Sequence, residues 1–404
     1  MTCRVLKDLL MPPYNLWYDR PGLNNLSLCN DIVKEDWSHL IKYKCDLPGA
    51  LRKAKLPFNI NKKSSPSDKI FYPIELGYRS SKRINIDDIE NFYSMFKNSN
   101  GQILIYYPQE GYLFENEFTP FFECLHSRYR KMPIRFVYGN LNQPTEVPNY
   151  IDYIGFDFFQ FAKRGDAPVL DFNKSSLKDF IFLNGRFKIP RALTYFDLLQ
   201  NKKLQNAKTS FHGYTANVNI DYKVELEEFI IRSPDVDKHF IYSIDHTQFF
   251  KWTNHLRPRK NHMQISHRLA WATPNELKLL YGDSFLNLTV ETYFNSDKNN
   301  LITEKTYNAI AYGMIFLMCG QQHTLKYLKE KGYQTFDDLF DESYDDKEHW
   351  SERWSIIKSN LDIWLSMSND NKKEYYQKSF NKLIHNQKLY YSESLLKDID
   401  KIFK

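Results

Sequence analysis

The sequence contains few of the residues that glycine-rich loops, disulfide frameworks and metal clusters require. Its 404 residues include 14 glycines, which is low for an α/β protein and argues against repeated glycine-loop architectures. The five cysteines are odd in number, form no CxxC pair and show no metal-ligand spacing. Disulfide frameworks usually need an even number of cysteines, so we expect reduced thiols and a cytoplasmic protein.

Long hydrophobic runs and several well-known catalytic motifs are also missing. No apolar segment approaches the roughly 20 residues that a helix needs to span a bilayer, and the first residues lack a signal-peptide pattern. The sequence has no GxxxxGKS phosphate loop and no HExxH, GxSxG or protein-kinase signature. We therefore expect neither a Golgi-type anchored enzyme nor a member of those enzyme classes.

What is present indicates two packed domains with alternating strands and helices. Hydrophobic residues make up 42% of the chain and aromatic residues 16%, which suffices for two cores of about 150–200 residues each. Short apolar strands, such as Gly101–Tyr107, Ile134–Tyr138 and Phe180–Leu183, alternate with amphipathic helices, which predicts parallel sheets covered by helices. We predict two Rossmann-like domains, residues 1–170 and 178–360. The net charge of +6 favours an anionic partner.

The segment Ser284–Gly320 is the most informative part of the sequence, because it predicts a strand, a polar loop, a helix and a second strand. Glu291 follows the first strand, and Thr303-Glu304-Lys305 begin the helix. A diphosphate there would meet backbone N–H groups, the positive helix end and the Lys305 ammonium, while Glu304 could accept hydrogen bonds from ribose hydroxyls. Alternatively, Thr303 is only an N-cap and the two charged residues form an ordinary first turn.

This segment resembles the donor-binding motif of the fucosyltransferase-like GT-B glycosyltransferases. The matching residues are Glu291, Thr303, Glu304, Lys305, Asn308, Gly313 and Gly320. The resemblance implies an α/β fold of GT-B architecture, in which two Rossmann-like domains face a cleft and the first domain binds the acceptor. It also implies that residues 361–404 form a helical crossover segment that packs back on the first domain.

The same resemblance assigns roles to individual residues of the second domain. It implies that Lys305 contacts the phosphates of a nucleotide-sugar donor, that Glu304 binds the ribose and that Glu291 acts near the transferred sugar. The chain departs from the family at Thr292-Tyr293, where the family has Asn-Ser, and at Met314-Ile315, where the family has a proline. Fucose is therefore not implied as the sugar.

A second segment, Phe182–Arg191, looks like the start of the C-terminal domain of related, often phage-encoded, glycosyltransferases. Asn184, Arg186 and Arg191 are the donor-binding candidates that it supplies. The planar guanidinium of Arg186 suits a pyrophosphate because it can bind two oxygens at once, although Arg186 could also be an ordinary surface residue.

The catalytic base is predicted from the chemistry of inverting transfer, which needs a carboxylate or histidine to take the proton of the acceptor hydroxyl. Glu110, just after a predicted strand of the first domain, is the preferred candidate, and Glu75 and Asp157 are the others. A retaining mechanism would not need this base. Basic side chains and a helix dipole would stabilise the leaving diphosphate, so we expect no cofactor and no required metal. The acidic pairs Asp337-Asp338 and Asp345-Asp346 are interpreted as structural.

The acceptor is predicted less sharply, from a basic stretch that contains aromatic residues. Its candidate acceptor or phosphate contacts are Trp252, His255, Arg257, Arg259 and Lys260. One hypothesis is a hydroxymethylated pyrimidine of phage-type DNA, which requires phosphate contacts and extraction of the base. The other is a surface glycan. A third hypothesis, from a different class, is a non-catalytic nucleotide or nucleic-acid binding protein that retains the GT-B fold.

Overall fold

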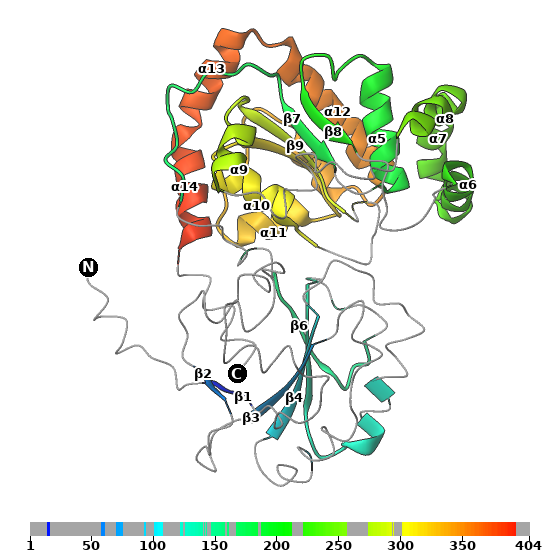
Figure 1. Cartoon of the computed structure of the whole chain (residues 1–404), viewed down its shortest axis with the longest axis vertical. Coiled ribbons are helices and arrows are strands. Elements are labelled where there is room, and N and C mark those ends of the chain that lie inside the picture. The colour runs from blue at the N-terminus through cyan, green and yellow to red at the C-terminus, as the bar shows by residue number, and fades with distance from the viewer. Residues whose placement is uncertain are drawn as a thin grey trace. The chain divides into compact units, whose positions relative to one another are not determined.

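The computed structural model of the chain divides into two compact units (Figure 1). The first contains residues 1–162 together with 393–404, and the second contains residues 163–392. The structure describes residues 14–16, 58–60, 70–75, 93, 101–107, 122–123, 126–139, 141, 143, 147–157, 160, 167–184, 187–211, 221–256, 274–292, 294 and 301–392.

The first unit contains a six-stranded sheet in which every described pair of strands is parallel. Its strands are β1 (Tyr14–Leu16), β2 (Phe58–Ile60), β3 (Ile70–Glu75), β4 (Gly101–Tyr107), β5 (Ile134–Tyr138) and β6 (Asp152–Gly155). Their order in the sheet is β2-β1-β3-β4-β5-β6, so the direction in which strands are added reverses between β1 and β3. The central strands β4 and β5 carry the buried residues Ile103–Ile105, Phe136 and Val137.

The second unit contains a four-stranded parallel sheet with the order β10-β9-β7-β8. These strands are β7 (Ile181–Asn184), β8 (Lys208–Phe211), β9 (Leu286–Val290) and β10 (Ile315–Cys319). Every residue of β7, β9 and β10 is buried, as expected for a parallel sheet with helices on both faces. The prediction of an α/β fold with a parallel sheet in each half is therefore confirmed.

Helices surround this second sheet. They are α5 (Ile189–Gln200), α6 (Tyr222–Arg232), α7 (Asp235–Ser243), α8 (His246–His255), α9 (Pro274–Tyr281), α10 (Glu304–Ala311), α11 (Thr324–Glu330), the 3₁₀ turn η3 (Glu342–Asp346), α12 (Trp350–Ser366), α13 (Asn369–Lys378) and α14 (Phe380–Tyr391). The connections through α5 and α10 run in opposite directions along the sheet. Because such crossovers are right-handed, α5 and α10 cover opposite faces. Within the described part of the chain, no helix is long and apolar enough to cross a membrane.

The helices α12 to α14 belong to the second unit, and the expected packing of residues 361–404 on the first domain stays a prediction. The indole N–H of Trp354 in α12 donates to Asp197 of α5 at 2.8 Å, and that of Trp364 donates to the carbonyl of Asp179 at 2.8 Å. In α14, the ring of Tyr390 stacks on Tyr307 of α10 at 5.5 Å between ring centroids. These aromatic faces are buried against the second sheet and its helices, whereas residues 393–404 are grouped with the first unit.

The segment 167–180 leads into β7 and is fastened to the end of the sheet opposite the carboxyl ends of the strands. The Lys174 ammonium donates to the carbonyl of Tyr281 at 2.7 Å, and the Tyr376 hydroxyl donates to the carbonyl of Asp171 at 3.3 Å. Burial lowers the pKa of Lys174 to about 7, although Asp283 and Asp171 oppose this shift. A buried lysine amine is therefore part of the attachment of this segment.

Two glycines of the segment that resembles the donor motif have a conformational or steric reason in the structure. Gly313, between α10 and β10, has a φ of +60°, and a Cβ there would lie 2.6 Å from Cδ1 of Leu170. A Cβ on Gly320, just after β10, would lie 2.7 Å from the Thr324 hydroxyl. Both positions therefore exclude larger residues for reasons that do not involve a ligand.

Candidate functional site

The topology of the second sheet singles out one place for a ligand. β7 has β8 on one side and β9 on the other, so the strand order reverses between β7 and β9. In open parallel sheets, ligands bind outside the carboxyl ends of the strands at such a reversal. Ile181 of β7 is in register with Asn287 of β9, which places Asn184 level with Val290 at these carboxyl ends. Glu291 and Thr292 follow directly, so the predicted donor residues of both segments meet at one edge.

Glu291 links the end of β9 to the start of α10. Its carboxylate accepts hydrogen bonds from the backbone N–H of Thr303 at 3.1 Å, the Thr303 hydroxyl at 2.5 Å and the Thr306 hydroxyl at 2.6 Å. All three side chains are completely buried. These are the contacts of a positioning residue that fixes the first turn of α10, and the catalytic role of Glu291 stays a prediction. Sequence reasoning missed Thr306, although a residue three positions after Thr303 lies on the same helix face.

Thr303 is the N-cap of α10, as the alternative interpretation of the sequence proposed. Its hydroxyl oxygen accepts from the backbone N–H of Lys305 at 3.4 Å and from the Lys305 ammonium at 3.1 Å. The same ammonium contacts the carboxylate of Glu304 at 3.2 Å, and both side chains are largely buried. A lysine charge is thus held at the positive end of the helix, which is the environment that binds anions.

Arg191, in the first turn of α5, reaches across to the end of β9. Its guanidinium donates to the carbonyl of Val290 at 3.1 Å and to the Thr292 hydroxyl at 3.0 Å. The side chain is 2% exposed, so it ties α5 to β9 from inside the protein. Thr292 is one of the positions at which the chain departs from the family motif, and here it serves as the partner of Arg191.

Two buried amides at the site lack full hydrogen bonding. Among the described residues, neither polar side-chain atom of Asn184 has a partner, and the Nδ2 atom of Asn308 has none. Asn184 is completely buried and Asn308 is 6% exposed. Buried polar atoms are nearly always paired. The unpaired atoms of Asn184 and Asn308 are therefore candidates for hydrogen bonds to a ligand. Arg186 lies outside the described residues.

The predicted acceptor contacts behave differently from one another. Trp252 of α8 stacks on Tyr195 of α5 at 5.5 Å and packs against Phe211 of β8 at 5.2 Å between ring centroids. It therefore belongs to an aromatic cluster that holds α8 on the second unit, and its role as an acceptor or phosphate contact stays a prediction. His255, the last residue of α8, is exposed.

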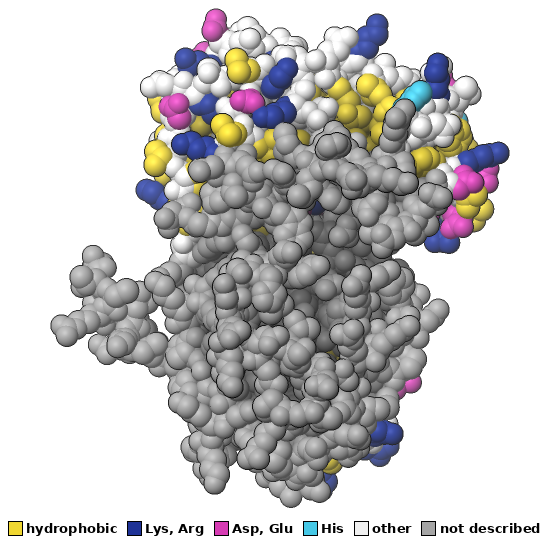
Figure 2. Space-filling view, viewed as in Figure 1, with side chains coloured by type: hydrophobic (Ala, Val, Ile, Leu, Met, Phe, Trp, Pro, Cys, Tyr) yellow, Lys and Arg dark blue, Asp and Glu magenta, His cyan; other side chains and the backbone are white. Residues whose placement is uncertain are grey.

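The remaining basic candidates do not form a described patch. Arg257, Arg259 and Lys260 lie outside the described residues. On the face seen in Figure 2, the described lysine and arginine side chains of the second unit are scattered among acidic and apolar ones. On this face the described residues therefore form no basic patch that favours one acceptor.

The base candidates lie in the first unit, whose sheet also has a strand reversal. Glu75 is the last residue of β3, one of the two strands at which the order reverses. Asp157, two residues after β6, is 6% exposed, and its carboxylate accepts from the backbone N–H of Gln160 at 3.2 Å. Glu110 lies outside the described residues.

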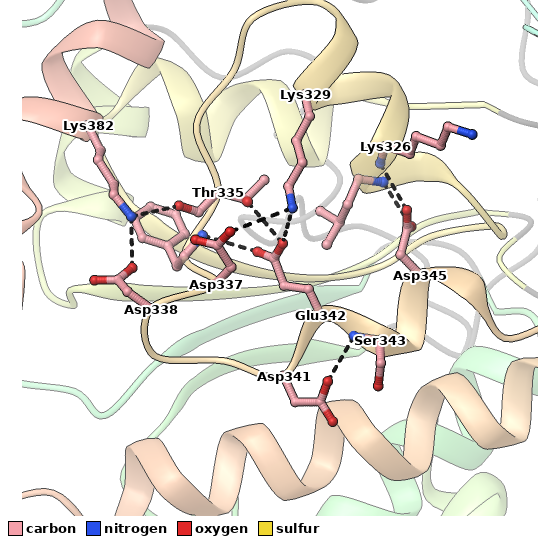
Figure 3. A network of polar contacts seen from close by, with 12 residues as sticks. Lys326, Lys329, Thr335, Asp337, Asp338, Asp341, Glu342, Ser343, Asp345 and Lys382 are labelled. Carbon is pink, nitrogen blue, oxygen red and sulfur yellow. Dashed lines mark hydrogen bonds and ion pairs between the residues drawn. The ribbon is translucent and has the colours of Figure 1, made fainter.

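The acidic residues near α11 have partners within the protein (Figure 3). Asp338 pairs with Lys382 at 2.7 Å and Glu342 with Lys329 at 2.7 Å. Asp345 accepts from the first backbone N–H groups of α11, at 2.8 and 2.9 Å. No group of three or more potential metal ligands occurs within the described ranges. The contacts agree with the structural interpretation of these residues.

Comparisons with known proteins add a fold likeness of low similarity. No protein-family model matches the chain, and no curated protein matches its sequence. One solved structure, of a DNA-modifying β-glucosyltransferase in the presence and absence of uridine diphosphoglucose, matches with a TM-score of 0.36 and 10% sequence identity. The match covers 89% of this chain and 95% of the glucosyltransferase chain. A structure of T4 phage β-glucosyltransferase has a TM-score of 0.31 and 11% identity, covering 93% and 99%. Both TM-scores are below 0.5, so neither likeness establishes a family for this chain.

Proposed function

We propose that the protein is a GT-B glycosyltransferase that binds a nucleotide-sugar donor at the carboxyl edge of the second sheet and needs no divalent metal. The observation that carries this proposal is the arrangement of Glu291, Thr303 and Lys305 at the strand reversal. A buried carboxylate holds the first turn of α10, and that turn holds a lysine charge at its positive end. The fucosyltransferase-like motif remains part of the proposal.

The donor diphosphate is assigned to the start of α10. Backbone N–H groups and the helix dipole favour its negative charge, and the ammonium of Lys305 can exchange its contacts with Thr303 and Glu304 for phosphate oxygens. The same groups would stabilise the diphosphate as it leaves, which is the task that a metal ion performs in other enzymes. Glu304 is assigned to the ribose, and Asn308, one helical turn later, lies on the same face of α10.

The transfer itself is assigned to a carboxylate of the first unit, Glu110 by preference and Glu75 or Asp157 otherwise. The acceptor hydroxyl gives its proton to this carboxylate as its oxygen attacks the anomeric carbon. The bond from that carbon to the diphosphate breaks, and its electron pair stays on the diphosphate oxygen. The acceptor is a surface glycan or a hydroxymethylated pyrimidine in DNA.

A binding protein without catalysis is the second candidate, because the proposed donor-binding residues would serve binding as well as turnover. One assay distinguishes the enzyme from the binding protein. Release of nucleoside diphosphate from a bound donor in the presence of acceptor supports the enzyme, whereas tight donor binding without turnover on any acceptor supports the binding protein.

The donor site is tested by thermal-shift measurements with UDP-, GDP-, CMP- and dTDP-sugars, with and without EDTA. We expect one donor class to raise the melting temperature, EDTA to have no effect and Lys305→Ala to abolish the shift. Lys326→Ala is the matched control, because Lys326 is also in the first turn of a helix, but the N–H groups of that helix are bound by Asp345. No shift with any donor, or an equal shift in Lys305→Ala, would contradict the proposed site.

A further inference from the structure

Asn184 is a buried polar residue at the carboxyl end of β7. It ends β7 at the strand reversal, it is completely buried, and among the described residues neither its Oδ1 nor its Nδ2 atom has a hydrogen-bond partner. A buried amide without partners destabilises the folded state. A residue of this kind needs an explanation, and a ligand that supplies the missing hydrogen bonds is one.

The pleat of β7 shows which way the Asn184 side chain points. The ring of Phe182 stacks on Tyr195 of α5 at 5.6 Å, so Phe182 faces α5. Side chains two positions apart on a strand share a face, so Asn184 faces α5 as well. Arg191 lies one helical turn before Tyr195, at the end of α5 that lies over the carboxyl end of β7. The amide of Asn184 therefore points toward the first turn of α5, beside the carboxyl end of β9 that Arg191 binds.

The chemistry of an amide restricts what it can bind there. Its Oδ1 accepts hydrogen bonds and its Nδ2 donates them. Ionised phosphate oxygens only accept, so a diphosphate would satisfy Nδ2 and leave Oδ1 buried without a partner. A group that both donates and accepts on neighbouring atoms satisfies the whole amide. Two adjacent hydroxyls of a sugar have this property, and so does the hydrogen-bonding edge of a nucleobase.

We propose that Asn184 selects the donor by binding such a paired donor and acceptor group of the nucleotide sugar, and not its phosphates. The inference rests on the proposed function and adds a second contact region to it. The start of α10 binds the diphosphate and, through Glu304, the ribose, whereas Asn184 at the carboxyl end of β7 binds a further uncharged group of the donor.

The test uses Asn184→Leu in the full-length protein, because leucine has a similar volume and no polar atoms. We expect the melting temperature of the ligand-free variant to stay the same or rise, since an unpaired buried amide is removed. We expect its affinity for the nucleotide sugar, measured by titration calorimetry, to fall about tenfold to hundredfold. Asn184→Ala removes the same atoms without adding bulk and should show the same loss of affinity.

The matched control is Asn360→Leu. Asn360 is also almost completely buried, but its Nδ2 donates to the carbonyl of Asp341 at 2.8 Å and its Oδ1 accepts from the backbone N–H of Asp341 at 2.9 Å. This variant should melt at a lower temperature and bind the donor with unchanged affinity. A ligand contact is thus recognised by lost affinity without a lower melting temperature, and a structural contact by a lower melting temperature without lost affinity.

Three probes identify the group that Asn184 binds: the nucleotide sugar, its nucleoside diphosphate and inorganic pyrophosphate. A loss confined to the nucleotide sugar assigns Asn184 to the transferred sugar, and a loss shared with the nucleoside diphosphate assigns it to the nucleoside. An equal loss for pyrophosphate, or unchanged affinity in both Asn184 variants while Lys305→Ala still weakens binding, overturns this inference alone. A wild-type protein that binds no nucleotide sugar overturns the proposed function together with it.

Discussion

The hydroxyl of Thr306 lies 2.6 Å from the carboxylate of Glu291, although 15 residues separate them in the chain. This hydrogen bond joins the helix and the strand that form the candidate donor site, and both partners are completely buried. The start of α10 is therefore held by hydrogen bonds to the carboxyl of Glu291 as well as by its own N-cap.

Thr306→Val should lower the free energy of unfolding by about 1–3 kcal/mol, because it leaves the completely buried carboxyl of Glu291 without one of its hydrogen-bond partners. Thr194→Val is the control, since the equally buried hydroxyl of Thr194 donates to the neutral carbonyl of Arg191 and should contribute about 1 kcal/mol. Urea denaturation of both variants measures the difference. Equal losses would show that the carboxyl of Glu291 is no stronger a partner for this hydroxyl than a backbone carbonyl is.

Arg191→Lys should destabilise the protein by about 1–3 kcal/mol, even though it keeps the positive charge. The guanidinium spans the carbonyl of Val290 and the hydroxyl of Thr292, and an ammonium lacks the planar fork that bridges them. Arg232→Lys provides the comparison, because Arg232 forms an exposed pair with Glu228 that should contribute little. Thermal denaturation that ranks the two variants equally would contradict the bridging role.

Trp252→Ala should lower the free energy of unfolding by about 3 kcal/mol, because it removes the ring on which Tyr195, Phe211 and Phe196 pack. Affinity for the donor, measured on the folded fraction, should change little. His255→Ala, at the exposed end of α8, should leave stability unchanged. A stable Trp252→Ala protein with impaired acceptor binding would instead support the acceptor role that the sequence predicts.

The lowered pKa of Lys174 leads us to expect that the stability of the folded protein depends on pH. In the unfolded chain its pKa is near 10.5, whereas in the folded protein burial lowers its pKa to about 7. Between these values the unfolded state binds more protons, so the contribution of Lys174 to the free energy of unfolding rises as the pH increases from about 7 to 10. Below pH 7 the lysine is charged in both states and this contribution is constant at its lowest value.

Lys174→Met tests this by removing the titrating amine while it keeps a chain of similar length. The difference in free energy of unfolding between wild type and variant should increase with pH across that window. Lys326→Met, at an exposed lysine, should show no such change. A difference that is flat with pH would mean that Lys174 is protonated in the folded protein throughout.

The parts of the fold that depend on local signals were predictable. Thr303 before a charged first turn is an N-cap pattern, and the hydroxyl does cap α10. The apolar strand that ends at Asn184 and the strand that precedes Glu291 appear where the sequence predicts them. These features involve residues close together in the chain, so propensity and spacing carry enough information.

The features that sequence reasoning missed depend on register between distant elements. The packing of Trp252 on Tyr195 and Phe211 depends on how α8 sits on α5 and β8, which no local pattern reveals. The same holds for Arg191, whose partners Val290 and Thr292 lie about a hundred residues later. The contacts of Trp354 and Trp364, which hold α12 on the second unit, likewise join residues far apart in the chain that no local pattern connects.

Cys319 also makes the candidate site observable without a ligand. It is the last residue of β10, it is completely buried, and burial raises the pKa of its thiol to about 12, so it cannot react while the sheet stays closed. In a protein whose other four cysteines are replaced by serine, the rate at which Cys319 is labelled by a thiol reagent would measure how often this strand opens locally. The labelling rate of Cys319 therefore reports on the stability of the strand beside the candidate donor site, and a bound donor should lower that rate.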